Sequence, residues 1–94
     1  MDISHLTGIG DYVAKQEKSR TLYLRGDRVF LVANKNTIEV RTDTELMKLL
    51  TEKYESVMQS RYFGRGGIEI VLAGQLSTSD LEDLIRLSYN LSGQ

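Results

Sequence analysis

The stretch TLYLRGDRVFLVA, residues 21–33, decides the fold predicted for this chain. Its two runs of mainly aliphatic and aromatic residues flank Gly26 and Asp27, which are residue types that short hairpin turns prefer. Residues 34–36 contain two asparagines and predict a second turn, after which residues 37–41 alternate apolar and polar side chains. The three runs together predict an antiparallel meander.

Two helices are expected after the meander. Thr42 and Glu45 have the spacing of a capping box, and apolar residues then recur at helical intervals for about three turns. Ser77 and Asp80 form a second pair of this kind, and residues 81–91 place one apolar stripe along a C-terminal helix.

Two further strands are expected between these helices, at residues 57–63 and 68–72. The glycines that separate them, Gly64, Gly66 and Gly67, indicate a turn or a close approach of the backbone.

The N-terminal segment predicts a helix as well, because Ile3, Leu6, Ile9 and Val13 follow at near-helical spacing. The expected order is therefore α-β-β-β-α-β-β-α. This order indicates an α+β domain with an antiparallel sheet of about five strands and helices packed on one side. Alternation along the strands predicts that one face of the sheet carries Leu22, Leu24, Ile38 and Val40, and the other Tyr23, Arg25, Glu39 and Arg41.

The composition indicates one packed domain over residues 1–94, since 40% of the residues are apolar and 27% are charged. No cysteine is present, which excludes disulfides and Cys-based zinc sites, and the one histidine cannot form a His-rich metal site. No apolar run approaches the roughly 20 residues that cross a bilayer, and the N-terminus lacks the features of a signal peptide. We therefore expect a cytoplasmic protein without membrane association, metal or cofactor.

The formal net charge of −1 covers an uneven distribution of charge along the chain. Residues 20–41 carry five basic side chains against two acidic ones, and residues 56–76 carry two against one. The other segments are acidic. Because the basic segments are the predicted strands with their loops, we expect cationic side chains to gather in one patch, away from the acidic helices.

Three motifs resemble the MmcQ/YjbR-like family: GDRVF at residues 26–30, SRYFG at residues 60–64 and LIRLSYNL at residues 84–91. The order and spacing of the motifs also match. The resemblance implies a compact α+β fold of the type compared with frataxin-like proteins and with the "double wing" DNA-binding domain of a phage transcription activator. It further implies DNA binding, the label that members commonly carry on grounds of fold.

The chain departs from this family at one point. Members often carry a tryptophan at the start of the strand after the Tyr-Phe motif, whereas Gly67 and Ile68 stand there in this sequence. The chain therefore lacks the aromatic platform that those members have at that point.

The loop at residues 61–67 is the most suggestive local feature. Arg61 and Arg65 can contact phosphates, Tyr62 can stack on a base, and the glycines let the backbone approach a ligand. The alternative interpretation is that Phe63 belongs to the core, Tyr62 lies at its rim and the arginines are solvated.

Arg25, Arg28 and Lys35 lie near the ends of the meander, where hairpin tips can act as wings that reach a groove or the backbone of DNA. A solvated sheet face explains the same residues. Ser88 and Tyr89 are expected to pack against the sheet. No nucleophile with a neighbouring base is evident in the sequence, so we do not expect an enzyme.

Two functions remain open. The first is a nucleic-acid-binding module with DNA as its partner, and its candidate contacts are Arg25, Arg28, Lys35, Arg61, Tyr62 and Arg65. The second is a protein-interaction or dimerisation module, because a sheet covered on one side leaves the other face open. A monomer or a weak homodimer is expected.

Overall fold

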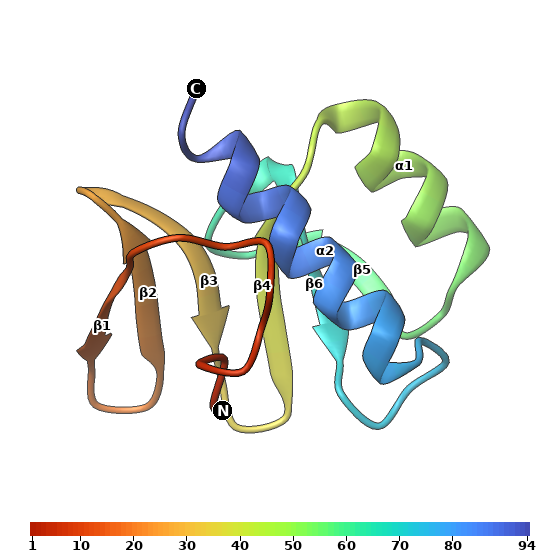
Figure 1. Ribbon diagram of the computed structural model, residues 1–94. Coiled ribbons are helices and arrows are strands. Elements are labelled where there is room, and N and C mark those ends of the chain that lie inside the picture. Colours follow the sequence, from red (N-terminus) through yellow and green to blue (C-terminus); the bar gives the residue numbers. More distant parts are fainter.

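A computed structural model describes the whole chain, residues 1–94. Six strands form one antiparallel sheet in the order β1-β2-β3-β4-β6-β5, and two helices lie against it (Figure 1). The elements are β1 (Val13–Gln16), β2 (Thr21–Arg25), β3 (Arg28–Ala33), β4 (Thr37–Arg41), α1 (Thr44–Lys53), β5 (Val57–Ser60), β6 (Gly64–Val71) and α2 (Thr78–Leu91). The predicted α+β class, the meander and both later helices are confirmed.

The predicted N-terminal helix is wrong. Residues 1–12 form turns and extended chain, and Val13 begins β1, which adds a sixth strand at the edge of the sheet. Gly8 has a φ of +84°, a left-handed conformation that ends any helical path at this point. Ile3 and Leu6 are nevertheless buried in the core. Their apolar side chains are therefore explained by packing against the sheet and α2, without a helix.

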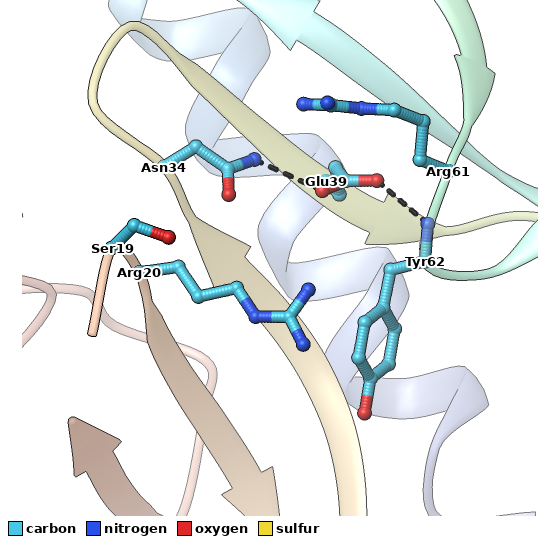
Figure 2. A pocket seen from close by; sticks show the side chains of 6 residues that line it. All are labelled: Ser19, Arg20, Asn34, Glu39, Arg61 and Tyr62. Carbon is cyan, nitrogen blue, oxygen red and sulfur yellow. Dashed lines mark hydrogen bonds between the residues drawn. The ribbon is translucent and has the colours of Figure 1, made fainter. Parts of the chain in front are cut away.

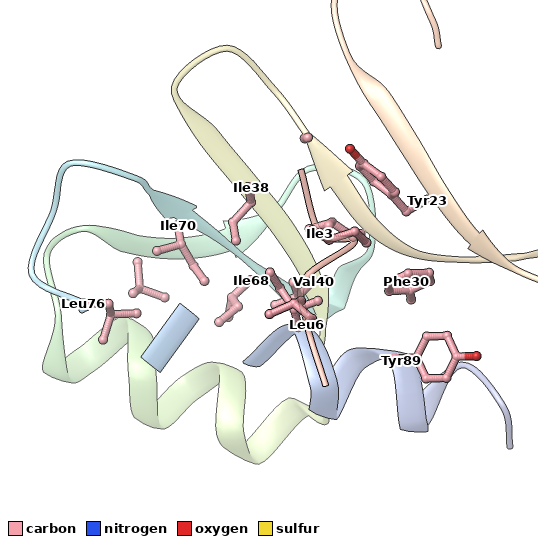
Figure 3. Close-up of a cluster of buried hydrophobic side chains, with 14 of the residues drawn as sticks. Ile3, Leu6, Tyr23, Phe30, Ile38, Val40, Ile68, Ile70, Leu76 and Tyr89 are labelled. Carbon is pink, nitrogen blue, oxygen red and sulfur yellow. The ribbon is translucent and has the colours of Figure 1, made fainter. Parts of the chain in front are cut away.

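Both helices cover the same face of the sheet. α2 packs on β3 and β4, while α1 packs on β5 and β6. Between these layers lies the main hydrophobic core, to which the N-terminal segment contributes two side chains (Figure 3). Its labelled members are Ile3, Leu6, Tyr23, Phe30, Ile38, Val40, Ile68, Ile70, Leu76 and Tyr89. No helix of the chain is both long enough and apolar enough to cross a bilayer.

The start of each helix is stabilised by a capping side chain. The predicted capping box of α2 is confirmed, since Ser77 and Asp80 exchange hydrogen bonds between side chain and backbone. α1 is capped instead by Asp43, whose carboxylate accepts the backbone N–H of Leu46 at 2.7 Å. Thr42, the predicted cap, is buried and its hydroxyl has no hydrogen-bond partner.

The opposite face of the sheet, called the open face below, holds a second and smaller apolar cluster. Leu22, Val29 and Val32 form it, with Leu24 and Phe63 packed against them. The predicted grouping of side chains is therefore wrong for β2. Strand pairing aligns Tyr23 with Leu31 and Leu31 with Val40, so Tyr23 faces the helices with Ile38 and Val40, while Leu22 shares the open face with Glu39.

A β-bulge in β3 brings two consecutive residues into the same core. Tyr23 pairs with Leu31 and Leu24 with Val29, which leaves Phe30 without a partner in β2. Phe30 and Leu31 are both fully buried in the core between sheet and helices. The Phe30 ring meets the Tyr89 ring of α2 edge-on, with centroids 5.0 Å apart. The bulge thus anchors α2 to the middle of the sheet.

Candidate functional site

A polar pocket of about 490 Å³ opens on the open face of the sheet. Its walls come from the β1–β2 turn, the end of β3, the middle of β4 and the loop between β5 and β6 (Figure 2). The lining residues are Ser19, Arg20, Asn34, Glu39, Arg61 and Tyr62. The size lies within the range of small-ligand sites, although most of those are more apolar.

Glu39 forms the floor of this pocket and is only 2% exposed. One carboxylate oxygen, Oε1, accepts hydrogen bonds from the hydroxyl of Ser60 and the backbone N–H of Tyr62, each at 2.9 Å. The other oxygen, Oε2, accepts the amide of Asn34 at 2.9 Å. No cationic group lies within 4.0 Å of the carboxylate. Neutral donors alone therefore hold this buried group, an arrangement that costs free energy compared with an ion pair.

Glu69 lies directly across from Glu39, on β6, and is equally buried. Arg61 donates to it from Nε at 2.9 Å and from Nη2 at 2.8 Å, and Thr37 donates its hydroxyl at 2.7 Å. The hydrogen bonds from Arg61 lower the pKa of Glu69, with a smaller contribution from Thr37, against the opposing effect of burial. The bidentate pair fixes the Arg61 guanidinium on the sheet, although its side chain is 77% exposed.

The loop that carries Arg61 and Tyr62 is tied down by the same two carboxylates. Besides donating to Glu39, the Ser60 hydroxyl accepts the backbone N–H of Phe63 at 2.8 Å, which closes a tight turn. Gly64 then takes a φ of +63°, where a side chain is strained. The buried carboxylates thus act as positioning groups for the loop.

Gly67 explains how closely this loop lies on the sheet. A Cβ atom on Gly67 would stand 2.5 Å from the carbonyl oxygen of Val40 and 2.7 Å from Cβ of Phe63. Gly66 has no such neighbour, because its nearest non-adjacent atom would be 3.6 Å away. The two interpretations offered for the glycines both apply, since Gly64 makes the turn and Gly67 permits the close approach.

Arg20 forms the opposite wall of the pocket. Its Nε donates to Glu17 at 2.7 Å, and its guanidinium lies over the Tyr62 ring at 5.2 Å from the centroid. The hydrogen bond to Glu17 raises the pKa of Arg20, and the charge of Glu39 raises it further. Arg61 likewise has its pKa raised first by its hydrogen bonds to Glu69 and then by Glu39. Glu39 therefore lies within electrostatic reach of both guanidiniums.

Several donors around the pocket have no partner in the protein. They are the two terminal nitrogens of Arg20, Nη1 of Arg61, and the hydroxyls of Ser19 and Tyr62. The Tyr62 ring is 38% exposed at the rim. Such a set can bind a group with several acceptor oxygens, and the ring can stack on a planar ligand.

The six predicted contact residues do not form the single patch that we expected. Arg61 and Tyr62 line the pocket, whereas the guanidinium of Arg25 donates to the Tyr89 carbonyl and lies 4.5 Å from the centroid of its ring. Arg28 donates to the carbonyl of Gln94, near the same end of the sheet.

The other two cations lie outside the pocket as well. Lys35 is exposed in the β3–β4 turn, at the end of β3 opposite to Arg28, which places the two roughly 20 Å apart along the strand. Arg65 is exposed near the start of α1, where its carbonyl accepts the Thr44 hydroxyl at 3.4 Å. Phe63 packs on the apolar cluster of the open face, as the alternative interpretation of the loop expects of a packed side chain, and the contacts of the loop with a nucleic acid stay a prediction.

Four residues that line the pocket were not predicted as site residues, namely Ser19, Arg20, Asn34 and Glu39. Glu39 follows the alternation of its strand, which assigned it to a solvated face, and nothing local signals that the β5–β6 loop covers it. One signal was present: both Glu39 and Glu69 stand between two aliphatic residues within a predicted strand, where a buried acidic side chain needs a partner.

No protein-family model matches the chain, and no curated protein matches it either. A solved structure does: the chain is similar to a protein from Pseudomonas syringae, whose crystal structure was determined by the Northeast Structural Genomics Consortium. The TM-score is 0.73 at 16% sequence identity, and the match covers 86% of each chain. At this identity the likeness shows a shared fold. Membership of the MmcQ/YjbR-like family stays a prediction.

Proposed function

We propose that this chain is a nucleic-acid-binding module that holds a single strand across the open face of its sheet. The observation that carries the proposal is the convergence of Arg20 and Arg61, from separate segments of the chain, on one polar pocket beside an exposed tyrosine ring.

Each of the two guanidiniums supplies a contact for a phosphate of the strand. Nη1 of Arg61 and both terminal nitrogens of Arg20 have no partner in the protein, while the Nε atoms are held by Glu69 and Glu17. The arginines are therefore oriented before a ligand arrives, and less conformational entropy is lost on binding. Phosphate contacts from arginine position a strand without reading its sequence.

Tyr62 supplies the second element that single-strand binding needs. Its ring is partly exposed and is braced on one side by Phe63, edge-on at 5.0 Å between centroids. Base stacking on such a ring is worth about 1–3 kcal/mol per base and tolerates any base. A duplex offers no free base face, so we assign a single strand to this site.

The distribution of charge is consistent with this orientation. Arg20, Arg41 and Arg61 border the open face, and Lys15 joins them through its pairing with Leu22. Six of the thirteen acidic side chains belong instead to the helices and their N-caps, namely Asp43, Glu45, Glu52, Asp80, Glu82 and Asp83. The resemblance to the MmcQ/YjbR-like family, whose members commonly carry a DNA-binding label, supports the same ligand class.

The test is a fluorescence anisotropy titration with a short labelled single strand at several salt concentrations. Two phosphate contacts on a single strand predict that affinity falls about sevenfold between 50 and 200 mM salt. Arg20→Ala and Arg61→Ala should each remove about half of this salt dependence, because each deletes one contact.

Lys48→Ala is the matched control for charge. Lys48 is exposed on α1, on the helix-covered side of the molecule, and makes no side-chain hydrogen bond. It should therefore bind like the wild type. The proposal is wrong if the wild type shows no binding at low salt, or if Lys48→Ala weakens binding as much as the pocket variants do.

One observation favours a second function, protein association through the sheet edges. All four residues of the edge strand β1 are exposed, including Val13 at 62%, and Met58 on the other edge strand is 41% exposed. Free strand edges can pair with a strand of another chain. Sedimentation equilibrium tests whether that chain is a second copy, because a monomer at high concentration contradicts self-association through these edges.

A further inference from the structure

Glu39 carries a negative charge that is not needed to hold the β5–β6 loop in place. The carboxylate is buried, lines the pocket and has no ion pair, whereas its neighbour Glu69 performs a similar positioning role with a bidentate arginine. A neutral acceptor could receive the bonds from Ser60 and Tyr62 at a lower desolvation cost. The negative charge is therefore available for a further contact.

The hydrogen bonds of Glu39 leave one acceptor position open. A carboxylate has about four lone-pair positions, and those of Glu39 accept two hydrogen bonds on Oε1 and one on Oε2. The open position on Oε2 belongs to a group that lines the pocket. A ligand donor that enters the pocket can complete the set.

The neighbours of this acceptor are both donors. Arg20 and Arg61 come from opposite sides of the pocket, with Glu39 between them in Figure 2. Both keep N–H groups without a partner in the protein. The pocket thus offers donor, acceptor and donor in sequence. A planar edge with acceptor, donor and acceptor is complementary to it.

We infer that the pocket binds the imide edge of a thymine or uracil base, with Glu39 Oε2 accepting the N3–H and one free N–H of each arginine donating to the O2 and O4 carbonyls, while the other free N–H groups contact the phosphates of the strand. This inference rests on the proposed function, because it names the base that the single strand presents beside Tyr62. Cytosine carries an acceptor at N3 and an amino group at C4, so it opposes like groups at two of the three positions. A carboxylate that reads a base by its N–H is an established form of readout for unstacked bases.

The test compares labelled oligo-dT, oligo-dC and oligo-dT methylated at N3 in the same anisotropy titration. Oligo-dT should bind the wild type at least about fivefold more tightly than either of the others, the lower limit for one good pair at a base edge. Methylation at N3 removes the single donor and leaves stacking, phosphates and carbonyls in place, so this probe does not depend on any variant folding.

Glu39→Gln provides the second measurement. The side-chain oxygen of glutamine can keep the bonds from Ser60 and Tyr62, while its amide replaces the Oε2 acceptor with a donor and gives up the bond from Asn34. We expect the preference for oligo-dT to disappear in this variant, with oligo-dC bound at least as tightly as before, because the new amide donor faces the N3 acceptor of cytosine. A preference that persists would come from the flexibility of the dT strand rather than from Glu39 and would overturn the inference.

The outcomes of these titrations distinguish a failure of the base assignment from a failure of the proposed nucleic-acid binding. If all three oligonucleotides bind the wild type equally, and Arg20→Ala and Arg61→Ala weaken all of them, the base assignment is wrong and nucleic-acid binding stands. If none binds the wild type more tightly than the arginine variants, the proposed function fails, and the base assignment fails with it.

Discussion

The hydroxyl of Ser88 on α2 donates a hydrogen bond of 2.5 Å to the backbone carbonyl of Phe30 on β3. The same hydroxyl accepts the backbone N–H of Arg41 on β4 at 2.7 Å. Because Phe30 is the bulged residue, the direct ladder between β3 and β4 ends at Leu31 and Val40. A side chain from the helical layer thus inserts between two strands and satisfies both of their free backbone groups.

Ser88→Ala should destabilise the fold by about 2 kcal/mol, because it leaves a buried N–H and a buried carbonyl without partners. Ser88 is fully buried, so water does not replace the hydroxyl without a rearrangement. Urea unfolding followed by circular dichroism measures the change. Ser79→Ala, at an exposed position in the first turn of the same helix, should stay within about 0.5 kcal/mol of the wild type. Equal stability of the two variants would contradict the bridging role.

Gly67→Ala should destabilise the protein by about 1–3 kcal/mol, since the new methyl group overlaps the Val40 carbonyl and the Phe63 side chain. Gly66→Ala is the matched control, because its methyl group would meet only ordinary contacts. Thermal unfolding of both variants under the same conditions provides the measurement. A Gly66→Ala variant that loses as much stability as Gly67→Ala would show that strand flexibility, not the close approach, sets the effect.

The Arg61–Glu69 pair predicts a loss of stability in acid. Hydrogen bonds from Arg61 lower the pKa of Glu69 below its ordinary value of 4.5, so at acidic pH the unfolded chain binds this proton more readily than the folded one. The stabilisation is complete above pH 4.5 and is lost as the pH falls through the lower folded-state pKa. Glu69→Gln should flatten this dependence, as measured by urea midpoints across the acidic range.

Glu52→Gln is the control for this loss of stability at acidic pH. It removes the same formal charge from an exposed position on α1 that makes no side-chain hydrogen bond or ion pair. If the urea midpoint falls just as steeply with decreasing pH in Glu69→Gln as in Glu52→Gln, the pH dependence comes from other carboxylates.

Tyr62→Ala should weaken single-strand binding by about 1–3 kcal/mol through the loss of one stacked base. Tyr62→Phe keeps the ring and should retain most of the affinity, because the hydroxyl makes no hydrogen bond in the protein. Anisotropy titration measures both, and thermal unfolding checks that the loop remains ordered. Loss of binding in both variants would mean that the hydroxyl, rather than the ring face, contacts the ligand.

The meander and the later helices were predictable because their signals are local. The Gly26–Asp27 turn and the capping box at Ser77 each depend on a few consecutive residues, and both appear in the structure as expected. The N-terminal segment shows the limit of this reasoning. Ile3 and Leu6 are buried at helical spacing, yet the left-handed Gly8 and the pairing of Val13 with Leu24 impose an extended path.

The candidate site was predictable only in part. Arg61 and Tyr62 were found because they are consecutive in a glycine-rich loop. Arg20 and Glu39 were not found, because they are far from this loop in the sequence. The strand order and the path of residues 60–64 over the sheet bring them close to it. Two basic residues near the ends of the meander show the opposite error, because they were predicted as contacts but are already engaged within the protein. Arg25 and Arg28 looked free in the sequence, but the C-terminal residues occupy both.

The facing pair of Glu39 and Glu69 also bears on how the polypeptide selects its native strand alignment. Neighbouring side chains in a strand point to opposite faces of the sheet. A register shift of one residue between β4 and β6 would therefore place a carboxylate in the hydrophobic core beneath the helices. The ionic cost of that error far exceeds the loss of a few apolar contacts. The two acids therefore disfavour a shifted register between β4 and β6, independently of any ligand.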